Sequence, residues 1–347
     1  MGNFFIEYRD PLFGLIILFC VIFIISFANY WWGAYKNKEE KHGIEQFIKK
    51  FEILSDQDEY KKLLKDVTIP KESLALLAHS YAKSGDYEKA IGLYLLVLEQ
   101  TNERKQKEFL LLELGKTYFR AGFLRRSEEI FLEALRLHPR NEEALKFLSV
   151  SYEKLKEHEK AIEVLNALEE LGAKVTNERA YLQALQITYD FKLSDAKKMD
   201  ALVDLAKKVP FLQRKVLEFA QIIHKPISIS LLDSFILEDC VDLLWYMDED
   251  FINLNDAHHI FVQQIQNAKG KTEDFSGNFA YLEFAIMAKL HVANYHDATL
   301  NFEYLCDTCK HTFPIHFYRC PNCHSIAKAK IIPIITTAKH EKNISFQ

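Results

Sequence analysis

The pattern of apolar residues changes twice along the chain, and its first part is an uninterrupted apolar run. Residues 11–35 (PLFGLIILFCVIFIISFANYWWGAY) contain no charged side chain, and Tyr and Trp gather at the end of the run. About 20 apolar residues cross the hydrocarbon core of a bilayer as a helix, and aromatic residues favour its interface with water. A cleaved signal peptide would have a basic segment before a shorter apolar run. The pattern predicts an uncleaved transmembrane anchor over residues 1–35.

Basic residues flank this run unequally, which predicts its orientation. One arginine, Arg9, precedes the run, and five lysines follow it within residues 36–50. Flanks rich in Lys and Arg remain on the cytoplasmic side of a membrane. We therefore expect a single membrane pass, with the bulk of the chain facing the cytoplasm.

A helical repeat follows. Three segments share the pattern Leu-x2-Leu-small-x2-Tyr and end at Tyr81, Tyr118 and Tyr152. The last two tyrosines are 34 residues apart, and the first two are 37 apart, which fits the same period plus a short insertion. A small residue in the first helix lets its partner helix approach, and the aromatic positions fill the space between neighbouring pairs. The pattern resembles the tetratricopeptide repeat. It predicts repeats over residues 43–210, with degenerate copies at 44–65 and 181–209.

A stack of such repeats has a concave surface that binds a peptide or a partner helix. Four polar residues of the first helices are predicted on this inner face, either as contacts or as solvated surface groups: His79, Lys83, Lys116 and Arg120. The Lys and Asn set with which chaperone-binding repeats clamp a C-terminal carboxylate is absent. We expect protein partners in this groove, and the sequence leaves the oligomeric state open.

The stretch that follows the repeats is acidic. Pro226 to Ala268 contains eight Asp or Glu residues and no Lys or Arg. We expect a helical extension over residues 211–300 whose carboxylates form a solvated face, or alternatively a docking surface for a basic partner or for the chain's own basic C-terminus. Cys240 is predicted to lie in the helical core.

Two Cys-x2-Cys pairs near the end of the chain carry the strongest chemical signal. The four cysteines are Cys306, Cys309, Cys320 and Cys323, with ten residues between the pairs. In a reducing compartment this spacing indicates a tetrathiolate metal site rather than disulfides. So short a segment buries too little surface to fold unaided, so metal binding would supply its folding energy. A tetrahedral S4 site accepts either zinc or iron. We predict a rubredoxin-like or zinc-ribbon metal domain over residues 301–347.

The side chains around the cysteines have different predicted roles. Phe313, Phe317 and Tyr318 are expected to pack over the metal site. Three histidines could ligate, but four cysteines already complete a tetrahedron, so they are expected on the surface: His311, His316 and His324.

Composition narrows the fold and the function. The 347 residues include only 11 Gly and 8 Pro, too few for the many tight turns of a β-sandwich or barrel. The predicted fold is therefore all-α, apart from the metal domain. A formal net charge of −5 provides no global basic field for nucleic acid. No nucleophile or phosphate-binding loop accompanies the acidic residues, so we expect a non-catalytic protein.

Each Cys-x2-Cys pair with its turn is called a knuckle below. The combination of anchor, repeats and two terminal knuckles resembles the lipopolysaccharide assembly protein B family of Gram-negative bacteria. The resemblance covers the repeat segments YAKSGDYEKAI, LGKTYFRAGFLRRSEEIF and YEKLKEHEKAIEVL, and the four cysteines match one for one. It implies an inner-membrane adaptor that regulates lipid A synthesis by helping the FtsH protease degrade the committing deacetylase. It also implies a rubredoxin-like domain that packs against the repeats.

The chain departs from that family at several points. It has fewer recognisable repeats, its acidic stretch does not match, and Lys310 and His324 replace the usual glycine after the second cysteine of each knuckle. Two alternatives therefore remain: a redox-active or metal-dependent subunit, and another envelope or secretion scaffold that binds peptides through its repeats.

Overall fold

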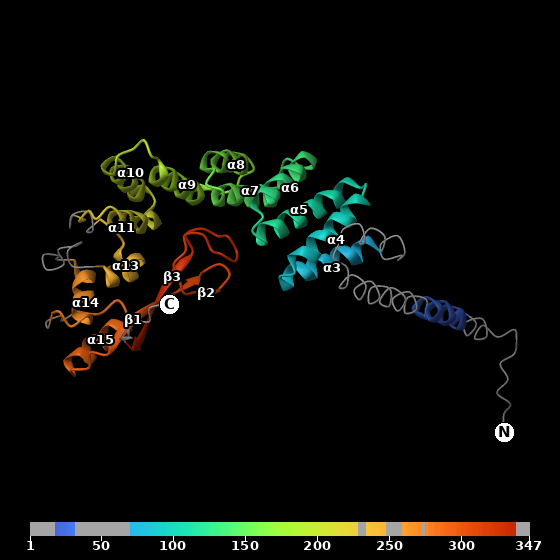
Figure 1. The fold of residues 1–347 in the computed structure, drawn as a ribbon. Coiled ribbons are helices and arrows are strands. Elements are labelled where there is room, and N and C mark those ends of the chain that lie inside the picture. The colour runs from blue at the N-terminus through green and yellow to red at the C-terminus, as the bar shows by residue number, and fades with distance from the viewer. Residues whose placement is uncertain are drawn as a thin grey trace, which may run out of the picture. The chain divides into compact units, whose positions relative to one another are not determined.

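The computed structural model describes residues 18–31, 70–227, 234–247, 259–272, 275 and 277–337 (Figure 1). The chain divides into two compact units, residues 1–144 and 145–347. In the described part of the chain, most residues are helical and a small sheet lies near the C-terminus. This agrees with the predicted helical fold carrying a small terminal domain.

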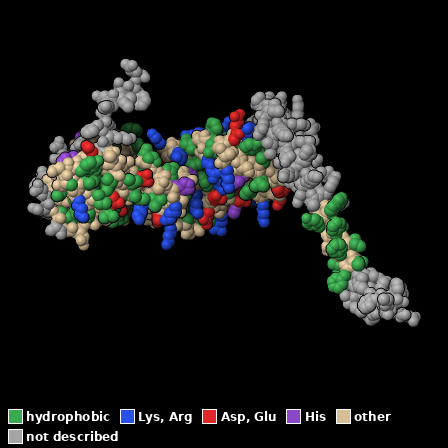
Figure 2. Space-filling view, turned by 90° about the horizontal axis from the view of Figure 1, so that it is seen from below, with side chains coloured by type: hydrophobic (Ala, Val, Ile, Leu, Met, Phe, Trp, Pro, Cys, Tyr) green, Lys and Arg blue, Asp and Glu red, His purple; other side chains and the backbone are tan. Residues whose placement is uncertain are grey.

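The first described segment, residues 18–31, is helical and apolar. Figure 2 shows its hydrophobic side chains in contact with solvent, and Phe23 is 70% exposed. Among the described residues, no helix is both long enough and apolar enough to cross a membrane. Most of the remaining residues of the predicted anchor, and the degenerate repeat predicted at 44–65, lie outside the described residues.

Four further helices build the first unit, and they pack in sequence order: α3 (Lys71–Ser84), α4 (Tyr87–Glu99), α5 (Arg104–Arg120) and α6 (Leu124–Leu137). Gly85 ends α3 with φ of 88°, and Gly122 follows α5 with φ of 83°, a left-handed backbone that glycine adopts without strain. A Cβ on Gly115 would lie 2.6 Å from the ring of Phe131. The small position predicted from the repeat pattern is therefore required by close packing between α5 and α6.

Helix α7 (Glu142–Lys154) carries the chain into the second unit. The helices that follow are α8 (His158–Glu170), α9 (Thr176–Tyr189), α10 (Asp195–Lys208) and α11 (Gln213–Ile222), with a 3-10 turn at Pro210–Leu212. Ser149 occupies the small position of α7 and donates to the carbonyl of Ala161 at 3.4 Å. Helices α9 and α10 pack against each other over the residues where a degenerate copy is predicted.

The rest of the second unit joins short helices to an antiparallel sheet. The helical elements are η2 (Leu237–Cys240), α13 (Val241–Tyr246), α14 (Ile260–Ala268) and α15 (Leu282–Val292). The strands are β1 (Ala298–Cys306), β2 (Thr312–Phe313) and β3 (Ala329–Thr337), in the order β2-β1-β3. In β1 every second residue from Ala298 to Cys306 is buried, and the residues between them are more exposed. One face of the strand therefore joins the core.

The core of the second unit is continuous from the helices to the sheet. Leu300 and Phe302 of β1 belong to the same buried cluster as Leu244 and Trp245 of α13. The hydroxyl of Tyr246 donates to the carbonyl of Leu300 at 2.9 Å. Figure 1 shows the sheet on the inner side of the curve formed by α9, α11, α13 and α15. Cys240 is 1% exposed, which confirms its predicted place in the core.

Candidate metal centre

The structure brings the four predicted cysteines together at the end of the sheet. Their ligand atoms all lie within 4.8 Å of one another, and the Sγ–Sγ distance is 3.6 Å both for Cys306 and Cys323 and for Cys309 and Cys320. A disulfide has a bond of about 2.0 Å, so these thiols are not bonded. Four sulfurs bound tetrahedrally at about 2.3 Å from a metal ion would be about 3.8 Å apart. The donor set therefore fits a single tetrahedral metal ion.

Two backbone turns hold the sulfurs in this arrangement. In the first, the N–H of Lys310 donates to the carbonyl of Cys306 at 2.8 Å, and in the second the N–H of His324 donates to the carbonyl of Cys320 at 3.0 Å. Strand β1 positions Cys306, and the bond from the N–H of Cys320 to the carbonyl of Ser325 closes the second turn. The two turns are thus built in the same way from equivalent residues.

Lys310 and His324 occupy the position where such turns usually have glycine. Their φ angles are 58° and 59°, both in the left-handed region. A residue with a Cβ adopts this region at a cost of about 1–2 kcal/mol. The tight turns therefore form without glycine, with some backbone strain stored next to Cys309 and Cys323.

Hydrogen bonds to sulfur favour thiolates at the first knuckle. The backbone N–H of His311, assisted by the side chain of Asn322, lowers the pKa of the Cys309 thiol to about 5. Burial raises the pKa of Cys306, but the N–H of Cys309 and the hydroxyl of Ser325 outweigh it, and the pKa lies below its usual value. Cysteine binds metal as the thiolate. The hydrogen bonds to Cys306 and Cys309 therefore favour the form of these side chains that binds a metal ion.

The thiol pKa of Cys320 is shifted in the opposite direction to those of Cys306 and Cys309. Burial raises the pKa of its thiol to about 12, against the opposing hydrogen bonds from the N–H groups of Cys323 and Asn322. Zinc or iron would neutralise the negative charge that burial disfavours. The S4 donor set suits both metals.

The second knuckle is docked on the repeat helices by the residue before Cys320. The guanidinium of Arg319 donates from Nε and Nη2 to the carboxylate of Glu153 on α7, at 2.9 and 2.6 Å to Oε2. Both side chains are about nine-tenths buried. Nη1 of Arg319 also donates to the carbonyl of His324 at 2.8 Å, within the knuckle itself. One side chain therefore ties the metal-binding turn to a helix far earlier in the chain.

Tyr318 provides a second docking point. Its hydroxyl donates to Glu218 of α11 at 2.8 Å, and its ring stacks on Tyr181 of α9 with centroids 5.2 Å apart. The ammonium of Lys215 lies 5.2 Å from the same ring. Burial raises the pKa of Tyr318, with the charge of Glu218 adding to the effect, so the hydroxyl remains a donor. The resemblance implied that the metal domain packs against the repeats, and these contacts confirm it.

One residue of the acidic stretch is buried rather than solvated. Asp242 of α13 is 3% exposed and forms two hydrogen bonds with Arg214 of α11, at 2.6 and 2.8 Å. The hydroxyl of Tyr304 on β1 donates to the same carboxylate at 2.6 Å. The prediction that the carboxylates of this stretch face solvent is therefore wrong for Asp242, because the buried guanidinium of Arg214 balances its charge. Asp233 and residues 248–256 of that stretch lie outside the described residues.

The aromatic residues and histidines near the cysteines have different environments. Phe313 and Phe317 belong, with the four cysteines, to the core cluster of the second unit, and their ring centroids are 5.1 Å apart. Tyr318 faces the helices instead. His316 is half-buried, and burial together with the charge of Arg214 lowers its pKa to about 3, so its predicted surface position is wrong. His311 is exposed, as predicted. His324 is half-buried and packs edge-on against Phe147 of α7, so its predicted surface position is also wrong.

The four residues predicted on the inner face of the repeats have different environments. Lys83 and Arg120 are exposed. His79 is half-buried and lies 3.3 Å from a carboxylate oxygen of Glu113. Lys116 is 9% exposed and pairs with Glu113 and Glu143, so its charge is already balanced within the unit. Sequence periodicity placed these residues on helix faces but carried no information about their ion-pair partners.

Comparison with known proteins identifies the repeats. Residues 73–108 and 112–175 each match a model of the tetratricopeptide repeat. The chain therefore contains tetratricopeptide repeats, a fold suited to protein–protein interaction. The chain is 33% identical over 115 residues to the Protein CTR9 homolog of Arabidopsis thaliana. The aligned segment is 33% of this chain and 10% of that protein.

Similar solved structures share little sequence with this chain. A MamA double mutant (RS-1 ArsTM) has 16% identity and a TM-score of 0.38, over 50% of this chain and 93% of that chain. A tetratricopeptide repeat protein from Parabacteroides merdae has 16% identity and a TM-score of 0.34, over 64% of this chain and 98% of that chain.

Proposed function

We propose that this protein is a non-catalytic adaptor in which tetratricopeptide repeats bind protein partners and a metal-loaded knuckle domain stiffens the end of the repeat array. In this proposal Cys306, Cys309, Cys320 and Cys323 are the ligands of one zinc or iron ion. The metal supplies structural crosslinking of the two knuckles. No acid, base or nucleophile of the chain has a catalytic part in it.

The observation that carries this proposal is the contact between Arg319 and Glu153. A free-standing electron carrier needs no buried ion pair to a repeat helix, whereas a scaffold gains a fixed surface from one. Because Arg319 directly precedes Cys320, ordering of the knuckle by metal also orders the guanidinium that binds α7. The proposed role of the metal is therefore to hold repeat helices and sheet in one arrangement.

We further propose that the N-terminal apolar run anchors the chain in the bacterial inner membrane, with the repeats on the cytoplasmic side. The resemblance to the lipopolysaccharide assembly protein B family suggests the partners. They would be the FtsH protease and the deacetylase that commits precursors to lipid A. The adaptor would then regulate lipopolysaccharide synthesis by bringing the deacetylase to the protease.

Crosslinking of the full chain in intact membranes, followed by mass spectrometry, tests this proposal. We expect crosslinks to a membrane protease in the unmodified chain, and their loss in Cys306→Ser and in Glu153→Ala. The matched control is Glu129→Ala, which removes an exposed ion pair with Arg126 on α6. Depletion should change deacetylase and lipopolysaccharide levels, and unchanged levels would refute the assignment to lipid A regulation.

A redox role is the second candidate, because an S4 site also suits iron. Metal analysis and absorption spectroscopy of the purified chain separate the two functions. A reversible iron spectrum would favour electron transfer, and stoichiometric zinc without redox activity would exclude it.

A further inference from the structure

Two histidines of the second unit meet at the junction between α15 and β1. His291 lies in the last turn of α15, and His296 lies just before β1 begins at Ala298. The two Nδ1 atoms are 3.2 Å apart, and the ring centroids are 5.4 Å apart. His291 is half-buried and His296 is exposed, so an ion in solution can reach the pair.

The turn that ends α15 brings the two rings together. The N–H of Asn294 donates to the carbonyl of His291 at 2.9 Å. The N–H of Tyr295 donates to the carbonyl of Leu290, also at 2.9 Å. Asn294 has a φ of 57°, in the left-handed region that asparagine visits more readily than most residues. The turn therefore places two imidazoles that are five residues apart in sequence next to each other.

The backbone after α14 supports one of the two rings. A Cβ on Gly270 would lie 2.8 Å from Cγ of His291 and 2.9 Å from its Nδ1, which is closer than real Cβ contacts. Only a residue without a side chain allows this approach. The ring of His291 therefore packs directly on the backbone of the loop that follows α14.

The separation of the two nitrogens fits two ligands of one metal ion. Imidazole nitrogens lie about 2.0–2.1 Å from zinc, so two of them are about 3.3 Å apart in tetrahedral coordination and about 3.0 Å apart at neighbouring octahedral positions. The observed 3.2 Å lies between these values. The same distance allows one ring to donate a hydrogen bond to the other, and a metal ion would take the place of that shared proton.

Protonation and charge at the pair suit a metal cation. Burial, and then the charge of His296, lowers the pKa of His291, so this ring is neutral at pH 7. Neutral imidazole is the form that ligates metals. The carbonyl groups at the C-terminal end of α15 add partial negative charge beside the pair, which favours a cation.

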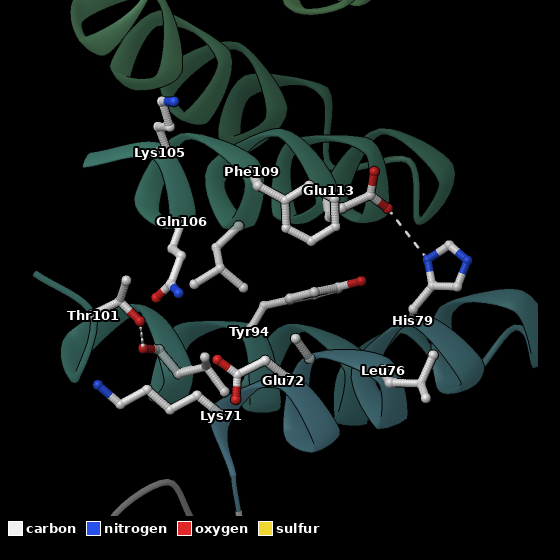
Figure 3. A pocket seen from close by; sticks show the side chains of 13 residues that line it. Lys71, Glu72, Leu76, His79, Tyr94, Thr101, Lys105, Gln106, Phe109 and Glu113 are labelled. Carbon is white, nitrogen blue, oxygen red and sulfur yellow. Dashed lines mark hydrogen bonds and ion pairs between the residues drawn. The ribbon is translucent and has the colours of Figure 1, made fainter. Parts of the chain in front are cut away.

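His79 of the first unit provides a contrasting case. It lines a pocket of about 540 Å³ in which the hydroxyl of Tyr94 has no hydrogen-bond partner among the described residues (Figure 3). Nδ1 of His79 lies 3.3 Å from one carboxylate oxygen of Glu113, and the ammonium of Lys116 lies 2.7 Å from the other. A metal ion there would compete with this ammonium group. Because His79 is half-buried like His291, it is a matched control.

We propose that His291 and His296 form a second metal site, in which the two Nδ1 atoms hold one divalent ion of the zinc, nickel and copper group. Apart from the four cysteines, the described part of the chain has no group of three or more converging ligand atoms, so water completes the coordination. Two protein ligands hold an ion less tightly than four, and the purified chain takes up this ion only when it is supplied. The bound ion fixes the end of α15 to the start of β1.

This second site is separate from the four cysteines. Strand β1 runs from Ala298, beside the histidines, to Cys306, and its nine residues span about 30 Å. The two sites therefore share no ligand and can be loaded one after the other. The second site goes beyond the proposed adaptor function and is independent of it.

Calorimetric titration with Ni²⁺ tests the proposal. The purified full chain carries no affinity tag, its cysteine site is first saturated with Zn²⁺, and elemental analysis confirms that the zinc is retained. We expect one Ni²⁺ to bind per chain. His291→Ala and His296→Ala should each weaken binding by about tenfold or more, since loss of a group that merely supports a ligand already costs this much. His79→Ala should bind Ni²⁺ like the unmodified chain.

His296→Gln separates a metal ligand from a structural hydrogen bond. Glutamine can still hydrogen-bond to His291 but does not replace an imidazole as a ligand. The metal-free variant should unfold at the temperature of the unmodified chain. Ni²⁺ should raise the unfolding temperature of the unmodified chain by mass action and leave that of the variant unchanged. Equal stabilisation of both chains would overturn the proposal.

Hydrogen exchange locates the bound ion. Ni²⁺ should slow exchange at residues 291–298 and leave residues 306–325 of the zinc-loaded knuckles unchanged. No Ni²⁺ binding up to about 1 mM, or binding that survives both alanine substitutions, would refute the site. Slower exchange at 306–325 alone would assign the ion to the cysteines and refute it equally.

Discussion

The carboxylate of Glu153 and the guanidinium of Arg319 form a buried bidentate ion pair, although 166 residues separate them in the chain. Glu153 belongs to a repeat helix, and Arg319 precedes a cysteine of the candidate metal site. The pair therefore links the two features that the sequence shows most strongly, the repeats and the Cys-x2-Cys knuckles. It also makes the stability of the docked domain measurable by substitution.

Glu153→Ala should lower the free energy of unfolding by about 2–3 kcal/mol, because it leaves a buried guanidinium without its carboxylate. Chemical unfolding of the full chain measures the change, and limited proteolysis should show faster cleavage within the knuckle domain. The exposed pair of Arg126 and Glu129 is the matched control, and Glu129→Ala should cost less than about 0.5 kcal/mol. Equal effects of the two substitutions would contradict docking through Arg319.

Metal binding should depend on the knuckle cysteines and not on Cys240. We expect one metal ion per chain by elemental analysis, with loss of the metal in Cys306→Ser. Cys240→Ala, which removes a buried thiol of the helical core, should retain full occupancy. Retained metal in Cys306→Ser, or loss in Cys240→Ala, would exclude the S4 site.

Removal of the metal should also release the knuckle from the helices. Because the folding energy of so small a domain comes from its metal, a chelator should increase hydrogen exchange at residues 306–325 and, through Arg319, at α7. The helices α3 to α6 of the first unit should exchange at an unchanged rate.

The stability of the second unit should fall in acid through Asp242. Burial alone would raise the pKa of this carboxyl, but the hydrogen bonds and charge of Arg214 and the hydrogen bond from Tyr304 hold it below its usual value. The stabilisation is therefore complete above the unfolded pKa of about 3.9 and is lost as the pH falls through the lower folded value. The difference in unfolding free energy between the unmodified chain and Asp242→Asn should be constant from pH 7 to about pH 5 and shrink below about pH 4. A difference independent of pH would show that folding does not shift the pKa of Asp242.

Gly115→Ala should destabilise the first unit by about 1–3 kcal/mol, because the new methyl group would overlap the ring of Phe131. Thermal unfolding followed by circular dichroism measures the effect. Phe131→Leu in the same chain should recover part of the loss. Gly122→Ala has open space around its Cβ and should cost only the strain of its left-handed backbone, about 1 kcal/mol.

Lys310→Gly should stabilise the metal-loaded chain by about 0.5–1 kcal/mol, since glycine adopts the left-handed φ of this position without strain. Lys330→Gly is the matched control, because it replaces an exposed lysine within β3, where glycine weakens a strand. Stabilisation of both variants, or of neither, would show that the turn stores no strain at Lys310.

Local patterns were sufficient for several features of this protein. The spacing of Leu, small and Tyr residues predicted the helix pairs, and the small position proved to be a contact between Gly115 and Phe131. The Cys-x2-Cys pairs predicted the four sulfurs that the structure brings together. Both patterns encode interactions between residues a few turns or one short loop apart, so periodicity and spacing reveal them.

Other features depended on contacts between distant segments. The sequence indicated an acidic stretch, but only the fold shows that Asp242 is buried against Arg214 and Tyr304. It marked Lys116 as a groove residue, whereas packing places two carboxylates around its ammonium. The pairing of Arg319 with Glu153 and the unpartnered hydroxyl of Tyr94 have no sequence signal at all.

By itself, then, the sequence determined the helical repeats, the apolar N-terminal run and the identity of the candidate metal ligands. The tertiary structure decided which charges are buried, how the knuckles dock on α7, α9 and α11, and where a pocket remains open. The physical reason is that apolar periodicity and ligand spacing are local properties of the chain. The partner of a buried charge or hydroxyl is instead selected by packing between segments that lie far apart in sequence.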